Sequence, residues 1–442
     1  MESKGPAEAG EPAERRMNDL VPAAWSKFSI ARLPRILFGS GTSGELGAVV
    51  REFGRKALVV VRGPGFTEST DWARLLVALE SAGVKVSVEA VSGEPSPTLI
   101  DGIVARHRGG GAGSGAGSGR GAGAAPIEVV VGVGGGSVLD TAKAVAGLLV
   151  PGNSVMDHLE GIGPELPYRG PAVPFVAVPT TAGTGSEATK NAVLSVRGAG
   201  GFKKSFRDES LVARVAIVDP DLLAACPPEL IAGNGMDALT QLLESYVSRR
   251  ANPFTDALAV SGLTCVRDGL LTWFESASID CADVSPETVA AARERMAYAA
   301  LCSGICLAQA GLGAVHGLAS PLGAQFPIPH GVACGATLTE ATRVNIAALE
   351  SRDPESVALS RYAEVGSLFT GIPGAGDQEA GTALIVALGL LTARLNVPRL
   401  SAYVVTEASI PTLVADSRGS SMKTNPIVLT DEEIASILRA SL

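Results

Sequence analysis

The stretch IEVVVGVGGGSVLDTAKAVAGLL, residues 127–149, decides the fold of this chain. Its first seven residues are almost continuously apolar, which is typical of a strand buried on both faces of a parallel sheet. A glycine-rich turn at 134–137 follows at once, and the apolar spacing then becomes that of a helix. Strand, glycine turn and helix in this order form the unit from which doubly wound α/β domains are built.

The same alternation extends on both sides of this stretch. Further strands are predicted within ARLPRILFGSG (31–41), KALVVVRGPGF (56–66), VKVSVEAV (84–91), FVAVPTTAG (175–183) and ARVAIVDP (213–220). Helices are predicted at 70–83 and 100–107. The tract GGGAGSGAGSGRGAGAA at 109–125 cannot build a core, and we expect a flexible insertion within the domain.

The pattern changes after residue 227. Helical periodicity dominates from there, with helices predicted near 236–248, 254–273, 286–310, 332–348, 355–370, 378–395 and 431–441. We therefore predict a disordered extension at 1–26, a Rossmann-like α/β domain with a mostly parallel sheet at 27–227, and an all-helical domain at 228–442.

Composition excludes several classes of function. A net charge of -9 and only 4% aromatic residues argue against a nucleic-acid partner. No run of about 20 apolar residues could span a membrane, and the polar N-terminus has no signal-peptide core. We therefore expect a cytoplasmic protein without a membrane or nucleic-acid partner. Cys302 and Cys306 lie four apart in an apolar helical run, and we interpret them as small buried hydrophobes.

The glycine turn at 134–137 is a candidate phosphate site. Glycines let the backbone approach a ligand closely, and the start of the next helix offers free N–H groups and a positive dipole end. Such turns are also often only structural. A second loop, TTAGTGSEAT at 180–189, follows the next buried strand. Ligands of open α/β sheets bind at the carboxyl ends of strands, so two such loops favour a nucleotide.

The helical half contains candidate metal ligands. Only four histidines occur in the chain, and His316 and His330 share the segment GLGAVHGLASPLGAQFPIPHGVACG, 311–335. We expect Asp237 to be their partner, on a helix that Asn234 caps; stabilisation of that helix start is the alternative role for this carboxylate. Gln241 lies four residues on, hence on the same face. A carboxylate and two imidazoles leave an open position for a substrate oxygen on a catalytic metal.

Several ordered motifs then point to one family. They are FGSG at 38–41, GGGSVLDTAK at 134–143, TTAGTGSEAT at 180–189, DPDL at 219–222, GMDAL at 235–239, VHGLASPLG at 315–323, PHGVA at 329–333 and NPIVLTDEEI at 425–434. Over about residues 28–442 the chain resembles the iron-containing (group III) alcohol dehydrogenases, relatives of dehydroquinate synthase. The resemblance implies a metal-dependent oxidoreductase that transfers a hydride between NAD or NADP and a small alcohol, aldehyde or ketone. It also implies a dehydroquinate synthase-like architecture and a homodimer.

The resemblance also implies roles for particular residues. The metal ligands of the family fall on Asp237, His316 and His330. The residues of the cofactor site fall on two loops and a lysine position: Gly135, Gly136 and Ser137, with Asp140 nearby; Thr180, Thr181 and Thr184; and Lys203 or Lys204. The two lysines can instead be a solvated charge pair on a loop.

Three positions depart from the family pattern. Gln241 stands where the family has a further metal His, so either the amide coordinates weakly or three ligands suffice. This puts iron in doubt and makes zinc or another divalent ion plausible. Ser320 replaces a His that the family uses to help proton transfer; either its hydroxyl passes the proton on through a water, or this role is absent here. Arg62 replaces an acidic residue after the second strand; a guanidinium suits a 2′-phosphate, which slightly favours NADP, although a solvated loop Arg is the alternative.

Three alternative functions stay open at this stage. One is a maleylacetate reductase-like keto-acid reductase, against which the retained Asp237 argues. Another is a dehydroquinate synthase-like lyase, which would need basic residues near the metal, whereas 311–335 contains no Lys or Arg. The third is a catalytically degenerate member that binds a nucleotide without turnover, suggested by Gln241 and Ser320.

Overall fold

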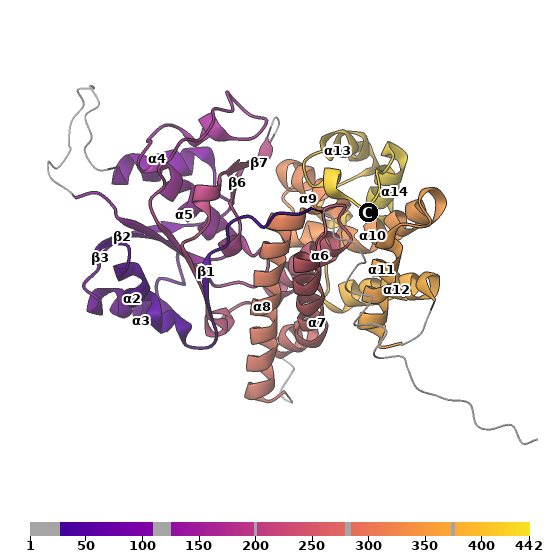
Figure 1. Ribbon diagram of the computed structural model, residues 1–442, viewed down its shortest axis with the longest axis horizontal. Coiled ribbons are helices and arrows are strands. Elements are labelled where there is room, and N and C mark those ends of the chain that lie inside the picture. The colour runs from indigo at the N-terminus through magenta and orange to yellow at the C-terminus, as the bar shows by residue number, and fades with distance from the viewer. Residues whose placement is uncertain (1–26, 109–124, 199–200, 279–283, 373–375) are drawn as a thin grey trace, which may run out of the picture.

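The computed structural model describes residues 27–108, 125–198, 201–278, 284–372 and 376–442 (Figure 1). The N-terminal half contains a six-stranded sheet in the order β1-β8-β5-β4-β2-β3, with every neighbouring pair parallel. Its strands are β1 (Arg35–Phe38), β2 (Lys56–Arg62), β3 (Lys85–Val91), β4 (Val129–Gly134), β5 (Phe175–Pro179) and β8 (Val215–Val218). The predicted parallel α/β fold is confirmed. The extension at 1–26 and residues 109–124 of the predicted insertion lie outside the described residues.

Helices cover both faces of this sheet. Alternate residues of β2 point to opposite faces. Val59 and Val61 pack with α2 (Leu46–Arg51) and α3 (Thr70–Ser81), whereas Leu58 and Val60 pack with α4 (Pro97–His107) and α5 (Gly136–Leu148). Burial on both faces explains why the strands β2 and β4 are almost entirely apolar.

The strand order places a topological switch beside the glycine turn. From β2 the chain goes to β3 on one side, and then returns to β4 on the other side. The crevice outside the carboxyl ends of two such strands is the usual ligand position in open α/β sheets. Arg62 ends β2 and Gly134 ends β4, so both lie at this switch point.

A two-stranded antiparallel hairpin was not predicted from the sequence. It consists of β6 (Asn191–Val196) and β7 (Phe202–Arg207). The alternative interpretation of Lys203 and Lys204 as a solvated charge pair on a loop is wrong, because both lie on β7, opposite Ser195 and Leu194. The hairpin escaped detection because β7 is only partly buried and three of its six residues are basic. The short 3₁₀ helices of this half are η1 (Thr42–Glu45), η2 (Val155–His158), η3 (Ser186–Ala188), η4 (Glu209–Leu211) and η5 (Pro220–Leu223).

The C-terminal half is helical, as predicted. Its helices are α6 (Pro228–Tyr246), α7 (Pro253–Ser276), α8 (Pro286–Ala310), α9 (Ala314–Gln325), α10 (His330–Arg352), α11 (Val357–Thr370), α12 (Asp377–Arg394), α13 (Ile410–Asp416) and α14 (Asp431–Ser441), with the 3₁₀ helices η6 (Leu400–Tyr403), η7 (Glu407–Ser409) and η8 (Met422–Thr424). Proline begins α6, α7 and α8, and the side chains of Asn252 and Ser285 cap the last two of these.

One predicted helix start was wrong. Helix α6 begins at Pro228 instead of near residue 236, because a proline at the first helical position has the right φ and needs no hydrogen-bond acceptor. Asn234 therefore lies inside the helix and does not cap it. Asp237 lies in the middle of α6, so stabilisation of a helix start cannot explain this buried carboxylate.

The two halves meet along several elements. In Figure 1 the sheet and its helices lie on the left and the helical half lies on the right. Helix α9 packs against β7, and α8 packs against η3 and η5. Among the described residues, no single helix has the length and apolar character of a membrane span; α8 and α9 reach that threshold only when taken together, and they are bent by 101° relative to each other.

Candidate metal and cofactor site

Asp237, His316 and His330 converge from three different helices. Asp237 comes from the middle of α6, His316 from the first turn of α9, and His330 from the first residue of α10. Nε2 of His316 lies 3.2 Å from Oδ1 of Asp237, and Nε2 of His330 lies 3.6 Å from the same oxygen. The structure therefore brings together the three side chains that the motifs singled out.

Gly331 allows α6 and α10 to approach this closely. A Cβ atom on Gly331 would lie 2.1 Å from the carbonyl oxygen of Gly233, a distance that real Cβ atoms do not show. The backbones of the two helices are therefore in direct contact, next to His330 and one turn before Asp237. Any larger residue at Gly331 would push the imidazole away from the carboxylate.

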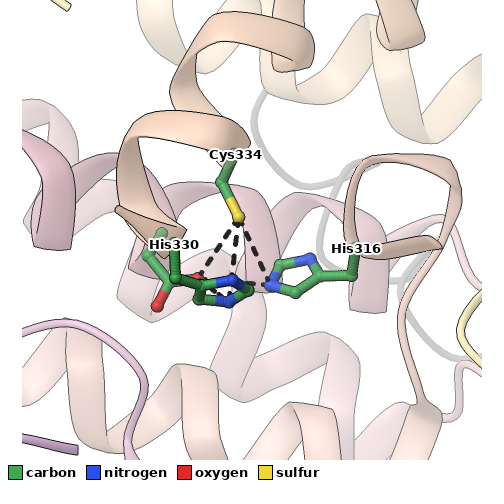
Figure 2. Close-up of side chains that lie close together, drawn as sticks. His316, His330 and Cys334 are labelled. Carbon is green, nitrogen blue, oxygen red and sulfur yellow. Dashed lines mark hydrogen bonds and ion pairs between the residues drawn. The ribbon is translucent and has the colours of Figure 1, made fainter. Parts of the chain in front are cut away.

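Cys334, which was not predicted as a ligand, completes this cluster. Its Sγ atom lies 3.8 Å from Oδ1 of Asp237, 3.8 Å from Nε2 of His316 and 3.9 Å from Nε2 of His330. Figure 2 shows the sulfur above the two imidazole rings, with both rings turned towards it. The four side chains form a candidate metal-binding group. The signal that could have found Cys334 is its spacing, because it lies one helical turn after His330.

Two further residues of α6 support the cluster. Nε2 of Gln241 donates a hydrogen bond to Oδ1 of Asp237 at 3.2 Å, whereas its Oε1 is buried without a hydrogen-bond partner among the described residues. Glu244 accepts a hydrogen bond from Nδ1 of His316 at 2.7 Å and another from the backbone N–H of Val315 at 2.7 Å. Glu244 thus fixes the ring of His316 with Nε2 towards Asp237, an arrangement common for histidines that bind metals.

The two histidines differ in how they are held. Within the part of the chain that the structure describes, Nδ1 of His330 has no hydrogen-bond partner, in contrast to Nδ1 of His316. The side chain of His330 is 25% exposed and that of His316 is 7% exposed. The His330 side of the cluster is therefore the side that is accessible from solvent.

Burial and mutual charge control the protonation of this cluster. Burial lowers the pKa of His330 to about 4 and outweighs the attraction of Asp237, so this imidazole is neutral and free to coordinate. Burial alone would raise the pKa of Asp237, but the neighbouring His330 and His316 lower it below its usual value. Burial would also lower the pKa of His316, but Cys334, Asp237 and Glu244 raise it well above its usual value. Burial raises the pKa of the Cys334 thiol to about 11.

The two candidate cofactor loops touch each other. A Cβ atom on Gly135 would lie 3.1 Å from Oγ1 of Thr181, and one on Gly136 would lie 2.6 Å from Oγ1 of Thr184. No side chain caps α5, which begins at Gly136, so its first N–H groups have no side-chain acceptor. A helix start with this character attracts phosphate. Thr180 opens the second loop directly after β5, and Ser137 is the second residue of α5.

Asp140 on α5 is hydrogen-bonded to the second loop and to β6. Its carboxylate accepts hydrogen bonds from Oγ of Ser186 at 2.5 Å and from the backbone N–H of Val193 at 3.0 Å. Lys143 is completely buried one turn later, and its Nζ donates to the carbonyl oxygen of Ser186 at 2.9 Å. Both side chains therefore hold the second loop against α5, which is a positioning role.

The two predicted lysines lie on strand β7, and Arg62 lies at the end of β2. Lys203 faces α9: its Nζ lies 3.0 Å from Oε1 of Glu94, and its carbonyl oxygen accepts a hydrogen bond from Oγ of Ser320 at 3.4 Å. Lys204 follows it on β7 and so points to the opposite face of the hairpin. Of the two lysines, Lys203 is therefore the one directed towards the helix that carries His316. Arg62 is exposed at the carboxyl end of β2.

Comparison with known proteins decides the family. The model of the iron-containing alcohol dehydrogenase family matches residues 34–220, and the model of the C-terminal part of the same family matches residues 231–442. The chain belongs to the iron-containing alcohol dehydrogenase family. The resemblance deduced from the motifs is confirmed.

Members of this family with known activities cover most of the chain. A 1-propanol dehydrogenase of Salmonella typhimurium is 35% identical over 70% of this chain and 76% of its own length. The NAD-dependent methanol dehydrogenase of Bacillus methanolicus is 28% identical over 92% of this chain and 98% of its own length. The predicted activity is therefore confirmed at the level of an oxidoreductase for a small alcohol or carbonyl compound.

Solved structures of the family share the fold. The structure of a 1,3-propanediol oxidoreductase superimposes with a TM-score of 0.78 at 27% identity, covering 94% of this chain and 100% of that one. The sulfoacetaldehyde reductase of Bifidobacterium kashiwanohense, solved in complex with NAD+, gives a TM-score of 0.76 at 27% identity over 94% and 99% of the two chains. The iron-containing alcohol dehydrogenases use NAD(P) and a metal, and this chain has a candidate site for the metal.

Proposed function

We propose that this chain interconverts a small alcohol and its aldehyde or ketone with a divalent metal held by Asp237, His316 and His330. The convergence of these three donors from α6, α9 and α10 on one buried point carries the proposal. For Gln241 the sequence left weak coordination or a three-ligand site as alternatives; in this structure its amide donates to Asp237 and so supports the carboxylate.

The donor distances fit a metal ion. A tetrahedral ion with bonds of about 2.0–2.1 Å to nitrogen and oxygen holds its ligand atoms about 3.3–3.4 Å apart. The two measured edges, 3.2 and 3.6 Å, lie on either side of this range. When bound, a divalent ion would act as a Lewis acid that polarises a carbonyl oxygen or acidifies an alcohol.

The chain's own residues would then orient the reactants. Glu244 holds Nε2 of His316 towards the site, and the partly exposed His330 marks the side from which substrate enters. A Cβ atom on Gly183 in the second cofactor loop would lie 2.9 Å from Cβ of Asn234, one turn before Asp237 on α6. This contact supports placing the nicotinamide end of the cofactor next to the substrate. Ser320 is our candidate for relaying a proton to water through its hydroxyl.

The cofactor would lie across the switch point of the sheet. We assign its diphosphate to Gly135, Gly136 and Ser137, and its further contacts to Thr180, Thr181, Thr184 and Lys203, with Asp140 as a support. The position of Arg62 at the end of β2 suits a 2′-phosphate, so we favour NADP over NAD. We also propose a domain boundary near residue 227, where the helical half begins, together with a homodimer and a cytoplasmic location.

Metal analysis combined with an activity panel tests this proposal. We expect purified protein to contain about one divalent ion per chain and to oxidise NADPH or NADH with at least one small aldehyde, ketone or keto acid. Asp237→Asn should lose both the metal and the activity, whereas Asp256→Asn, which changes an acidic residue elsewhere in the helical half, should keep both. If Asp237→Asn retained full metal content and rate, the site assignment would be wrong.

A further inference from the structure

We propose that Cys334 is the fourth protein ligand of the metal, as a thiolate, so that the donor set is Asp-His-His-Cys. This inference rests on the metal site proposed above and assigns its remaining donor. Aspartate, histidine and cysteine together form a set that zinc accepts readily, and thiolate favours zinc over the harder divalent ions.

The geometry of the sulfur carries the inference. Its distances to the three other donor atoms are 3.8, 3.8 and 3.9 Å, so it is nearly equidistant from all of them. With a zinc–sulfur bond of about 2.3 Å and zinc–nitrogen bonds of about 2.0–2.1 Å, tetrahedral geometry gives edges of about 3.5–3.6 Å. The sulfur therefore stands at the apex of a slightly expanded tetrahedron whose base is formed by Asp237, His316 and His330.

A hydrogen-bonding role explains this position less well. A thiol is both a weak donor and a weak acceptor, and hydrogen bonding would favour particular partners, yet the sulfur lies at nearly the same distance from all three neighbours. Cys334 is also completely buried beside the three other proposed donors. On binding of the ion, the thiol proton would pass to solvent and the sulfur would form the bond to the metal.

The position of Gln241 supports the same assignment. Its amide nitrogen faces Asp237, where it donates a hydrogen bond to the carboxylate oxygen that would coordinate. Because Gln241 supports Asp237 and is not itself a ligand in this assignment, the fourth coordination position of the metal is available to the sulfur. A fifth ligand, the substrate oxygen, can then enter from the exposed side at His330, because zinc sites expand to five-coordination during catalysis.

Cobalt substitution tests this inference without any measurement of activity. The full-length protein is stripped of metal with a chelator and titrated with Co²⁺ alone, and its absorption spectrum is recorded. We expect a sulfur-to-cobalt charge-transfer band in the near ultraviolet together with the intense visible bands of four-coordinate cobalt. Cys334→Ser and Cys334→Ala should lose the charge-transfer band. Their affinity for Zn²⁺ should also fall, and the loss should exceed the factor of about 10–100 that is typical when a residue outside the coordination shell is removed.

Two control variants make the outcomes distinct. Cys302→Ser changes another buried cysteine in α8 and should keep the band, as should Gln241→Ala. If the wild-type protein binds cobalt without a charge-transfer band, or if only Gln241→Ala loses metal, the assignment of Cys334 is wrong while the metal site stands. If the wild-type protein binds cobalt no better than Asp237→Asn does, both the metal site and the thiolate assignment fail. Thermal unfolding of each variant shows whether a lost band reflects loss of the fold.

Discussion

Glu244 accepts a hydrogen bond from Nδ1 of His316 at 2.7 Å across the interface between α6 and α9. The same carboxylate also accepts the backbone N–H of Val315, so it holds both the ring and the start of the helix that carries it. Because Nδ1 donates to Glu244, the ring presents Nε2 to Asp237. A residue that touches no substrate therefore orients a candidate metal ligand.

Glu244→Gln should weaken metal binding while keeping the fold. The amide fills almost the same volume, but it removes the negative charge that favours coordination through Nε2 of His316. We expect the affinity for Zn²⁺ to fall about 10–100-fold, measured by competition with a chromophoric chelator. Glu364→Gln is the matched control, because Glu364 accepts a hydrogen bond from Tyr246 elsewhere in the helical half. Equal affinities for the Glu244 variant and wild type would contradict the orienting role.

Gly136→Ala should impair cofactor binding and leave metal content unchanged. The new methyl group would lie 2.6 Å from Oγ1 of Thr184 and would push the two cofactor loops apart. Overpacking of this kind costs about 1–3 kcal/mol, so we expect the Kd for the reduced cofactor to rise by at least about fivefold in a fluorescence titration. Gly102→Ala in α4 is the control, because its Cβ meets nothing closer than a guanidinium nitrogen of Arg106 at 3.5 Å. An unchanged Kd would show that the loops do not hold the cofactor.

The fold was largely predictable because its signals are local. The buried strand, glycine turn and helix at 127–149 predict the parallel sheet, and the helix starts at Pro286 and Thr430 are visible in the sequence. The β6–β7 hairpin was missed because the basic side chains of its exposed strand hide the alternation. The start of α6 was missed because Asn234 offers a cap signal at a position where the helix, begun at Pro228, already continues.

The site was predictable only in part, for a physical reason. Motifs single out Asp237, His316 and His330, but nothing in their spacing places three helices around one point. The backbone contact between Gly233 and Gly331 sets the distance between α6 and α10, and it also brings the sulfur of Cys334 into the cluster. Contacts of this kind depend on tertiary packing. The sequence offers only the one-turn spacing of Cys334 from His330 as a signal for the sulfur, and it offers none for Glu244.

Arg62→Gln should change the choice of cofactor. If the guanidinium binds the 2′-phosphate of NADP, its loss removes a charge-assisted contact worth about 1.5–3 kcal/mol. We expect the Kd for NADPH to rise about ten- to a hundredfold, while the Kd for NADH changes less than about threefold. Arg55→Gln, just before the opposite end of β2, should change neither value. Either of two results would refute the assignment. One is a wild-type protein that prefers NADH, and the other is an Arg62→Gln variant that binds both cofactors as tightly as wild type does.

Glu187 should make the stability of the protein fall as the pH rises. Burial raises the pKa of this carboxyl from 4.5 to about 7, although the buried Lys143 beside it opposes the shift. Between these two pKa values the folded chain keeps a proton that the unfolded chain has lost, so each pH unit costs about 1.4 kcal/mol of stability. Glu187→Gln is neutral at every pH and removes this dependence. Between pH 5 and 7.5 the Tm of the variant should fall less than the Tm of wild type, and the difference between the two decreases should be about 3–6 °C.

A control variant must show how much of the pH dependence of Tm comes from the other titrating groups of the chain. Glu209→Gln alters an exposed glutamate in η4 that pairs with Lys190, and its Tm should follow the wild-type pH dependence. Because the Gln variant at 187 has no proton to lose, its advantage should be largest at the alkaline end and smallest near pH 5, below which both proteins carry a neutral side chain there. Parallel Tm curves for wild type and Glu187→Gln would mean that this carboxyl titrates at its ordinary pKa in the folded protein.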